Sequence, residues 1–270
     1  MRRLLAALLA LALSGCATFH SPYVGQGPHP QLQRGVECLP VDFIGNILAL
    51  PAKLLLWDWR FANHAISQDT EAELVAYLEA REQPVLEDAV FRLNQYRPGQ
   101  DLARLARNGY VAWPYRLLLG LPVTLLGEVL LPGRLFPWGD YYNPWTNTVH
   151  LYSDHPAIAL HEAGHVHDLG RRRWKGTYSA IRLIPFVDLY QEYEASHEAL
   201  GYFTQETPKI EDEIAAYKIL YPAYGTYAGS YLFAPIGTVI GALLGHLSGR
   251  SAAKRVQQAP PSPVAAPAAP

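Results

Sequence analysis

Two histidines, His161 and His165, stand four residues apart, and Glu162 follows the first of them. On a helix this spacing brings both imidazoles to one face, because four steps of about 100° return to within about 40° of the start. Two imidazoles on one face can bind one metal ion, and a carboxylate beside the first can reach a metal-bound water. The spacing therefore predicts a hydrolytic zinc site.

Strand and helix signals flank this motif. Residues 148–152 alternate and are rich in β-formers, so they predict a short strand. Ser153 or Asp154 is expected to cap the helix that follows, Pro156 fits its first turn, and Gly170 fits its end. The motif is thus expected on a helix that comes directly after a strand.

A strand followed by a metal-binding helix resembles the zincin metallopeptidases, in which the strand edges the cleft and pairs with extended substrate. Catalytic zinc usually has three protein ligands. The metzincin branch would have Gly and His where this chain has Asp168 and Arg171, which excludes it. Residues 191–200 instead resemble the Glu-x-Glu-Ala-Asp segment of gluzincins such as the CAAX prenyl protease and HtpX-like groups. The resemblance implies that Glu192 is the third ligand, and Ser196 stands where that family has Asp.

Other residues near the motif leave alternatives open. The rivals for the third ligand on the same helix are Glu194, Glu198 and His197. His167 is expected to face away from the metal, at the surface or in the core. Asp168 shares the metal face, where it could hydrogen-bond a ligand imidazole or simply complement the helix end.

The resemblance also implies a mechanism. Zinc lowers the pKa of a bound water to about 7, Glu162 takes the proton and passes it to the leaving amine, and a nearby donor stabilises the oxyanion. The candidates for this donor are Tyr152, Tyr190, Tyr193 and His150.

The N-terminus has the pattern of an export signal. Residues 1–15 combine a basic start with an apolar run of about ten residues, which is too short to span a bilayer. The run ends in Leu-Ser-Gly-Cys16, which resembles the lipobox of bacterial lipoproteins and implies lipidation of Cys16; an ordinary signal peptide is the alternative. Ala17 favours the periplasmic face of the outer membrane, by resemblance to Gram-negative lipoproteins. The net charge of −2 disfavours nucleic acid as a partner.

Composition divides the chain further. The expected segments are a signal peptide (1–15), a tether (16–35), an apolar and helical accessory region (36–138), a zincin-like core (139–220), a glycine-rich apolar helical segment (221–250) and an Ala/Pro-rich disordered tail (251–270). Within the accessory region, a helix is expected to start at Pro84 and to include Val90–Leu93. In the glycine-rich segment, a four-residue glycine spacing favours very close helix approach. Residues 230–248 could span a membrane, form a hairpin or lie in the core.

Together these patterns predict a mostly helical α+β chain: a minimal zincin-like domain with a short edge strand before the metal-binding helix, plus apolar helical segments. The expected function is an envelope-tethered zinc metallopeptidase that acts on a protein or peptide through Glu162, with Zn²⁺ on His161, His165 and Glu192. The alternative is a zincin-like lipoprotein that serves as a non-catalytic scaffold or membrane-binding protein.

Overall fold

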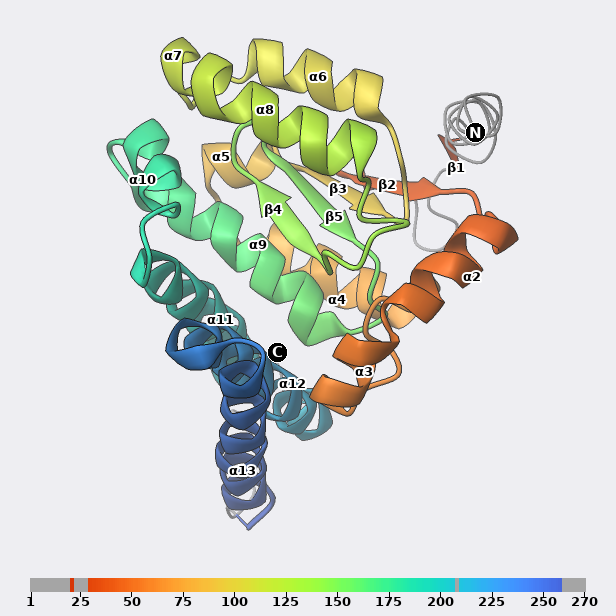
Figure 1. Cartoon of the computed structure of the whole chain (residues 1–270), viewed down its shortest axis with the longest axis vertical. Coiled ribbons are helices and arrows are strands. Elements are labelled where there is room, and N and C mark those ends of the chain that lie inside the picture. The colour runs from red at the N-terminus through yellow and green to blue at the C-terminus, as the bar shows by residue number, and fades with distance from the viewer. Residues whose placement is uncertain (1–19, 22–28, 207–208, 259–270) are drawn as a thin grey trace, which may run out of the picture.

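The computed structural model describes residues 20–21, 29–206 and 209–258, which are mostly helical with one small sheet (Figure 1). The strands, in their order across the sheet, are β1 (His20–Ser21), β2 (Leu32–Gly35), β3 (Val90–Leu93), β5 (Thr148–Leu151) and β4 (Tyr141–Asn143). The three inner strands are parallel, and β1 and β4 pair antiparallel at the two edges. The expected fold class, α+β and mostly helical, is confirmed.

The two faces of the sheet differ in chemistry, because neighbouring residues of a strand point to opposite sides. Phe91 and Val149, which are paired across β3 and β5, enter the main apolar core. Arg92 and His150, the next pair along, are also buried but contact acidic groups on the helices α6 (Pro98–Arg107) and η2 (Leu125–Leu130). One face is therefore apolar and the other carries a buried polar network.

Helix α9 carries the motif and lies against the apolar face of the sheet (Figure 1). Its packing partners are α4 (Gln68–Glu79), α5 (Pro84–Glu87), α10 (Lys175–Ile181), α11 (Val187–Gln205) and α12 (Ile210–Phe233). α9 itself spans Pro156–Arg171, and its Leu160, Ala163 and Val166 are fully buried. This packing fixes the helix that must present the two histidines.

The remaining helices surround this centre. They are α2 (Leu39–Leu48), α3 (Leu50–Leu56), α7 (Trp113–Tyr115), η1 (Arg116–Gly120), α8 (Leu121–Thr124) and α13 (Ile236–Gln258). α13 folds back on α12 along the glycine run, with Gly225 opposite Gly241 and Gly229 opposite Gly237. A Cβ on Gly225 would lie 2.1 Å from the carbonyl oxygen of Gly241. The glycine spacing thus builds a closely packed hairpin of two helices.

The helix predicted to start at Pro84 and to include Val90–Leu93 is shorter than expected. α5 ends at Glu87, and Val90–Leu93 forms strand β3 instead of continuing the helix. A short apolar run suits either structure, and here the parallel pairing with β2 and β5 decides in favour of the strand.

The ends of the metal-binding helix also differ from expectation. The N-cap is His155, whose Nδ1 accepts a hydrogen bond from the Ala157 N–H, rather than Ser153 or Asp154. Gly170 lies inside α9 rather than after it, and the Gln83 side chain occupies the space where a Cβ would stand.

The strand predicted at 148–152 forms as β5, directly before α9, but it lies inside the sheet between β3 and β4. The edge on this side is β4. The short edge strand that precedes the metal-binding helix is therefore Tyr141–Asn143.

The structure joins segments that composition separated. β2 comes from the expected tether and β3 from the expected accessory region, yet both pair in the sheet that holds β5, and the main core draws side chains from all of them. The tail prediction was wrong for residues 251–258, which continue α13 to Gln258. The signal peptide at 1–15 and Cys16 lie outside the described residues.

Candidate metal centre

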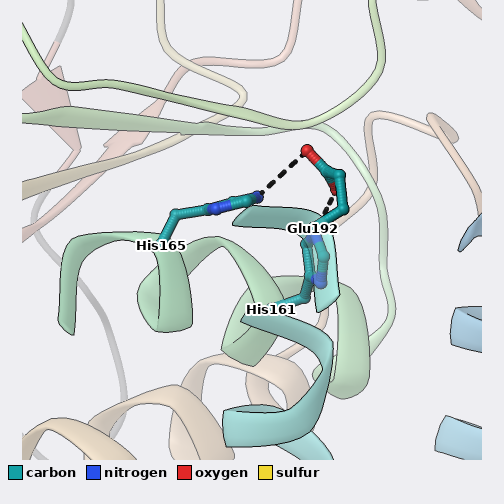
Figure 2. Close-up of side chains that lie close together, drawn as sticks. All are labelled: His161, His165 and Glu192. Atoms are coloured by element: carbon teal, nitrogen blue, oxygen red, sulfur yellow. Dashed lines mark hydrogen bonds and ion pairs between the residues drawn. The ribbon is translucent and has the colours of Figure 1, made fainter. Parts of the chain in front are cut away.

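His161, His165 and Glu192 converge from two helices (Figure 2). Nε2 of His161 lies 3.1 Å from Oε2 of Glu192, and Nε2 of His165 lies 3.4 Å from Oε1 of the same carboxylate. One ligand atom from each residue falls within 4.8 Å of the others, so the three could hold one metal ion. Of the sequence-predicted residues, these are the ones that the structure brings together around one point.

Close helix packing sets this geometry. Gly164 on α9 faces Ala195 on α11, and a Cβ added to Gly164 would lie 2.8 Å from the Ala195 carbonyl oxygen. Ala195 is itself fully buried. Because both positions are small, α11 approaches α9 closely enough for Glu192, about one turn before Ala195, to reach the two imidazoles.

The charges in the site keep Glu192 ionised and His165 neutral. Burial opposes ionisation of Glu192, but His165 and Arg182 outweigh it and hold the pKa of this carboxyl well below its usual range. Burial lowers the pKa of His165 to about 4, so its imidazole is neutral at pH 7. Burial acts in the same direction on His161, but its hydrogen bond to Glu192 raises the pKa of His161 overall. An ionised carboxylate and a neutral imidazole are the states that bind metal.

Ser196 contacts the far side of the first ligand. Its Oγ lies 3.2 Å from Nδ1 of His161, on the ring nitrogen opposite the one that faces Glu192. In metal sites this second nitrogen is usually held by a hydrogen bond that orients the ring. The serine that departs from the gluzincin pattern thus occupies the position from which the ring can be oriented.

Glu162 faces two adjoining cavities, of about 140 Å³ and 170 Å³. The residue is 5% exposed, and its Oε2 has no hydrogen-bond partner among the residues that the structure describes. Burial raises the pKa of Glu162 to about 8, against the effect of His161 and with that of Glu192. The residues that line both cavities are Asp140, Glu162, Glu192 and Tyr227. At this pKa the group is largely protonated at pH 7, and a cation held by the three ligands would lower the pKa and favour the carboxylate that a general base needs.

The rival ligands point elsewhere. Glu194 lies 3.2 Å from Nη2 of Arg172, and Glu198 pairs with Arg81 and with His167. His197 is exposed and stacks on the ring of Tyr193.

The other neighbours of the motif are also accounted for. Asp168 pairs with Arg172 and accepts a hydrogen bond from Tyr178. It therefore does not hydrogen-bond a ligand imidazole, which was one of its two expected roles. His167 is bound to Glu198, away from the ligand cluster, as expected.

Two residues of the site were missed in the sequence. Arg182, from the turn after α10, forms an ion pair with Glu192, and Tyr227, from α12, lines both cavities. Arg182 is the only Lys or Arg between Lys175 and Lys209, a signal that could have singled it out. Tyr227 gave no signal, because it lies in the glycine-rich run.

The oxyanion donors proposed from sequence lie away from Glu162. Tyr152 is buried in a separate small cluster, Tyr190 accepts a hydrogen bond from Arg172, and Tyr193 is exposed. His150 belongs to the polar face of the sheet.

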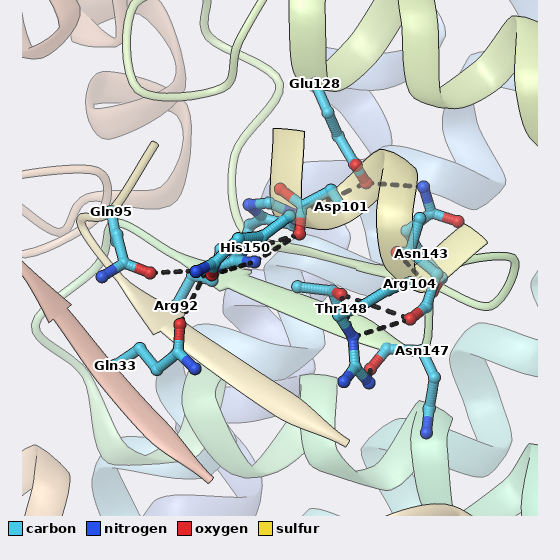
Figure 3. A network of polar contacts seen from close by, with 12 residues as sticks. Gln33, Arg92, Gln95, Asp101, Arg104, Glu128, Asn143, Asn147, Thr148 and His150 are labelled. Atoms are coloured by element: carbon cyan, nitrogen blue, oxygen red, sulfur yellow. Dashed lines mark hydrogen bonds and ion pairs between the residues drawn. The ribbon is translucent and has the colours of Figure 1, made fainter. Parts of the chain in front are cut away.

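A second group, Asp101, Glu128 and His150, also has ligand atoms within 4.8 Å of one another, and all three residues are buried (Figure 3). Here Nη2 of Arg92 lies 2.6 Å from Oδ1 of Asp101, with both side chains 1% exposed. Nδ2 of Asn143 donates to Oε1 of Glu128, so both carboxylates already have partners in a buried polar network.

No family model, no curated protein and no solved structure matches this chain.

Proposed function

We propose that this protein is a zinc metallopeptidase of the gluzincin type. One observation carries the proposal: His161, His165 and Glu192 meet at one point, and Glu162, whose Oε2 has no partner among the described residues, lines the cavities beside them. Two imidazole nitrogens and one carboxylate are a ligand set that catalytic zinc sites use, with a position left for water or substrate.

The mechanism assigns each group a task. His161, His165 and Glu192 would hold the zinc ion, which when bound acidifies water and polarises a carbonyl. Oε2 of Glu162 accepts the proton of the attacking water and then gives it to the amide nitrogen that leaves.

Tyr227 is the best-placed donor for the oxyanion. It lies in the wall shared by both cavities, together with Glu162 and Glu192. The charge of Glu192 and burial raise the pKa of the Tyr227 phenol above its usual range, so the hydroxyl keeps its proton and can donate it in a hydrogen bond.

The edge strand favours a peptide as substrate. The sheet ends at β4, and Tyr141 and Tyr142 of this strand line a cavity together with Glu162. An extended peptide that pairs with a sheet edge gains backbone hydrogen bonds along its length. Such pairing at β4 would bring its amide groups towards Glu162.

The test compares two glutamates on one helix. Purified protein should contain about one zinc per chain, which Glu192→Ala should lose and Glu194→Ala should keep, because Glu194 pairs with Arg172 instead. Glu162→Gln should keep the zinc and lose all peptidase activity. The substrate is sought by comparing the envelope proteomes of wild-type and Glu162→Gln cells. Full zinc in Glu192→Ala would contradict the ligand assignment.

We infer further that the chain is a lipoprotein of the outer membrane, tethered at Cys16. The support is the signal pattern of residues 1–15 and the lipobox ending. Mass spectrometry should find a diacylated N-terminal cysteine, and Cys16→Ser should abolish it.

The scaffold alternative keeps one observation in its favour. Arg182 already pairs with Glu192, so the carboxylate is neutralised without a metal. If this alternative holds, purified protein has no zinc, and Glu162→Gln cells show the wild-type phenotype.

A further inference from the structure

The outward face of α2 and α3 is apolar, whereas its charged residues turn inward. Large exposed side chains along it are Leu39 (81%), Phe43 (61%), Ile47 (45%) and Leu54 (60%). Asp42 is ion-paired with Arg134 at 2.7 Å, and Lys53 is 2% exposed, with Nζ donating to the Trp59 carbonyl at 3.0 Å. A helix that faces water has the opposite arrangement.

The segment from α7 to η2 repeats this inversion. Between Ala112 and Trp138 no charged side chain is exposed. Its exposed large residues are Trp113, Leu117, Leu118, Val123, Leu125, Leu126, Leu130 and Trp138. Glu128 and Thr124 point inward and are buried. A tryptophan stands at each end of this apolar stretch, as at the boundary between a bilayer core and water.

The α12–α13 hairpin has the same character. No formal charge stands between Lys218 and Arg250. Its exposed large residues include Leu232, Phe233, Ile236, Ile240, Leu243, Leu244 and Leu247. His246 is buried, and its Nε2 lies 2.9 Å from the carbonyl oxygen of Leu55.

These three segments are neighbours. The ion pair between Asp42 and Arg134 joins α2 to the chain that follows η2. His246 joins α13 to α3, since it contacts Leu55 and stacks on Trp57 at 3.9 Å between ring centroids. Figure 1 shows α3 between α2 and α12. We call the exposed apolar residues of α2–α3, α7–η2 and α12–α13 the apolar surface.

The apolar surface is unusually extensive for a protein that is surrounded only by water. Exposed apolar patches on soluble monomers rarely exceed a few hundred Å², whereas this one draws on three helical segments. Over the described residues, no single helix is long and apolar enough to cross a membrane, but α2 and α3, bent by 52°, together meet that requirement in length and composition. A bent apolar pair that displays its face outward suits shallow insertion.

The N-terminus points to the same occupant. His20 pairs with Gly35, four residues before Leu39, the most exposed residue of α2. Cys16, the expected lipid attachment, is four residues before His20, which is at most about 14 Å of chain. A lipid there would place the start of α2 at the membrane.

A cationic rim adjoins the surface. Arg171, Arg173 and Trp174 are exposed at the end of α9, and the following helix α10 packs on α7 through Thr177 and Tyr115. Lysine and arginine beside an apolar surface attract anionic lipid headgroups.

We propose that the apolar surface inserts into one leaflet of a lipid bilayer, so that the folded domain binds membrane by itself and the lipid on Cys16 is not its sole contact. This binding does not rest on the proposed catalysis: Glu162→Gln should bind vesicles as the parent does.

The experiment removes the lipid and changes the surface. The mature chain, residues 16–270 with Cys16→Ser, is mixed with vesicles of phosphatidylethanolamine and phosphatidylglycerol and then sedimented. The parent should pellet with the vesicles. Phe43→Asp/Leu54→Asp, which alters exposed side chains only, should partition at least tenfold less. Ile210→Asp is the matched control: it is also exposed (46%) but lies at the far end of α12 from Phe233, and it should pellet like the parent.

Circular dichroism is used to check that each variant is folded. The proposal is overturned if the parent stays in solution with vesicles, or if Phe43→Asp/Leu54→Asp pellets as well as the parent, since charge alone would then explain binding. It is also overturned if the parent does not bind vesicles but forms a dimer by light scattering, and Phe43→Asp/Leu54→Asp is monomeric. A second copy of the chain would then cover the apolar surface.

Discussion

The hydroxyl of Ser196 lies 3.2 Å from Nδ1 of His161, whose Nε2 faces Glu192 3.1 Å away. Each ring nitrogen of His161 therefore has a partner. Through its contact with Nδ1, Ser196 can orient the ring, and this directs Nε2 towards the ligand cluster.

Removing this contact should weaken zinc binding without abolishing it. Ser196→Ala should lower the zinc affinity by about 10- to 100-fold, because the ring loses its orienting partner. Ser196→Asp should restore or exceed the wild-type affinity. Competition with a chromophoric chelator measures both. His197→Ala is the control, since His197 is the next residue on the helix and points outward. Unchanged affinity in Ser196→Ala would remove the orienting role.

The chain should bind one zinc ion rather than two. In the second acidic group, Arg92 binds Asp101 and Asn143 donates to Glu128, so we expect this buried network to stay without metal. Elemental analysis should give one equivalent of zinc in the wild type and in His150→Gln, and none in Glu192→Ala. A second equivalent that disappears in His150→Gln would contradict this reading of Asp101, Glu128 and His150.

The glycine hairpin predicts a matched pair of stability effects. At Gly229 a Cβ would lie 2.0 Å from the Gly237 carbonyl oxygen, whereas at Gly201 nothing lies within 4 Å. Gly229→Ala should therefore cost about 2 kcal/mol or more of unfolding free energy, because two backbones must separate. Gly201→Ala, inside α11, should add about 0.5–1 kcal/mol. Urea unfolding measures both; equal effects would show that the hairpin is not closely packed.

Acid should destabilise the protein through His155. Its Nδ1 caps α9, and burial lowers the pKa of His155 to about 4, with Arg60 adding to this and Asp58 opposing it. The unfolded imidazole binds its proton near pH 6.5. Between these values the unfolded state holds more protons, so the unfolding free energy falls as the pH falls, by at most about 3 kcal/mol.

The check is His155→Asn, which keeps an oxygen able to cap the helix. The difference in unfolding free energy between about pH 7.5 and about pH 4.5 should be smaller in this variant than in the wild type. An equal difference in both would assign the acid sensitivity to other groups.

What the sequence could predict depended on how local each feature is. Local periodicity predicted the strand, the helix with the two histidines and the α+β class. Glu192 was predicted from the resemblance of residues 191–200, which lie on one helix, to the gluzincin segment. β3 was missed because Val90–Leu93 becomes a strand only through two parallel neighbours distant in the chain. Arg182 and Tyr227 reach the site from separate elements, so no spacing rule links them to His161. The divisions at 35 and 138 followed composition, whereas the sheet is assembled across them.

The position of the 170 Å³ cavity beside Glu162 has a consequence for how the turnover rate depends on substrate concentration. Ala52 and Leu55 of α3, Trp138 and Tyr227 line it, and these belong to or adjoin the elements that carry the apolar surface. If the surface lies in lipid, the cavity opens beside the bilayer and substrate arrives by lateral diffusion. Turnover would then follow the mole fraction of substrate in the leaflet, and adding inert lipid at constant bulk concentration would slow the enzyme by dilution in two dimensions.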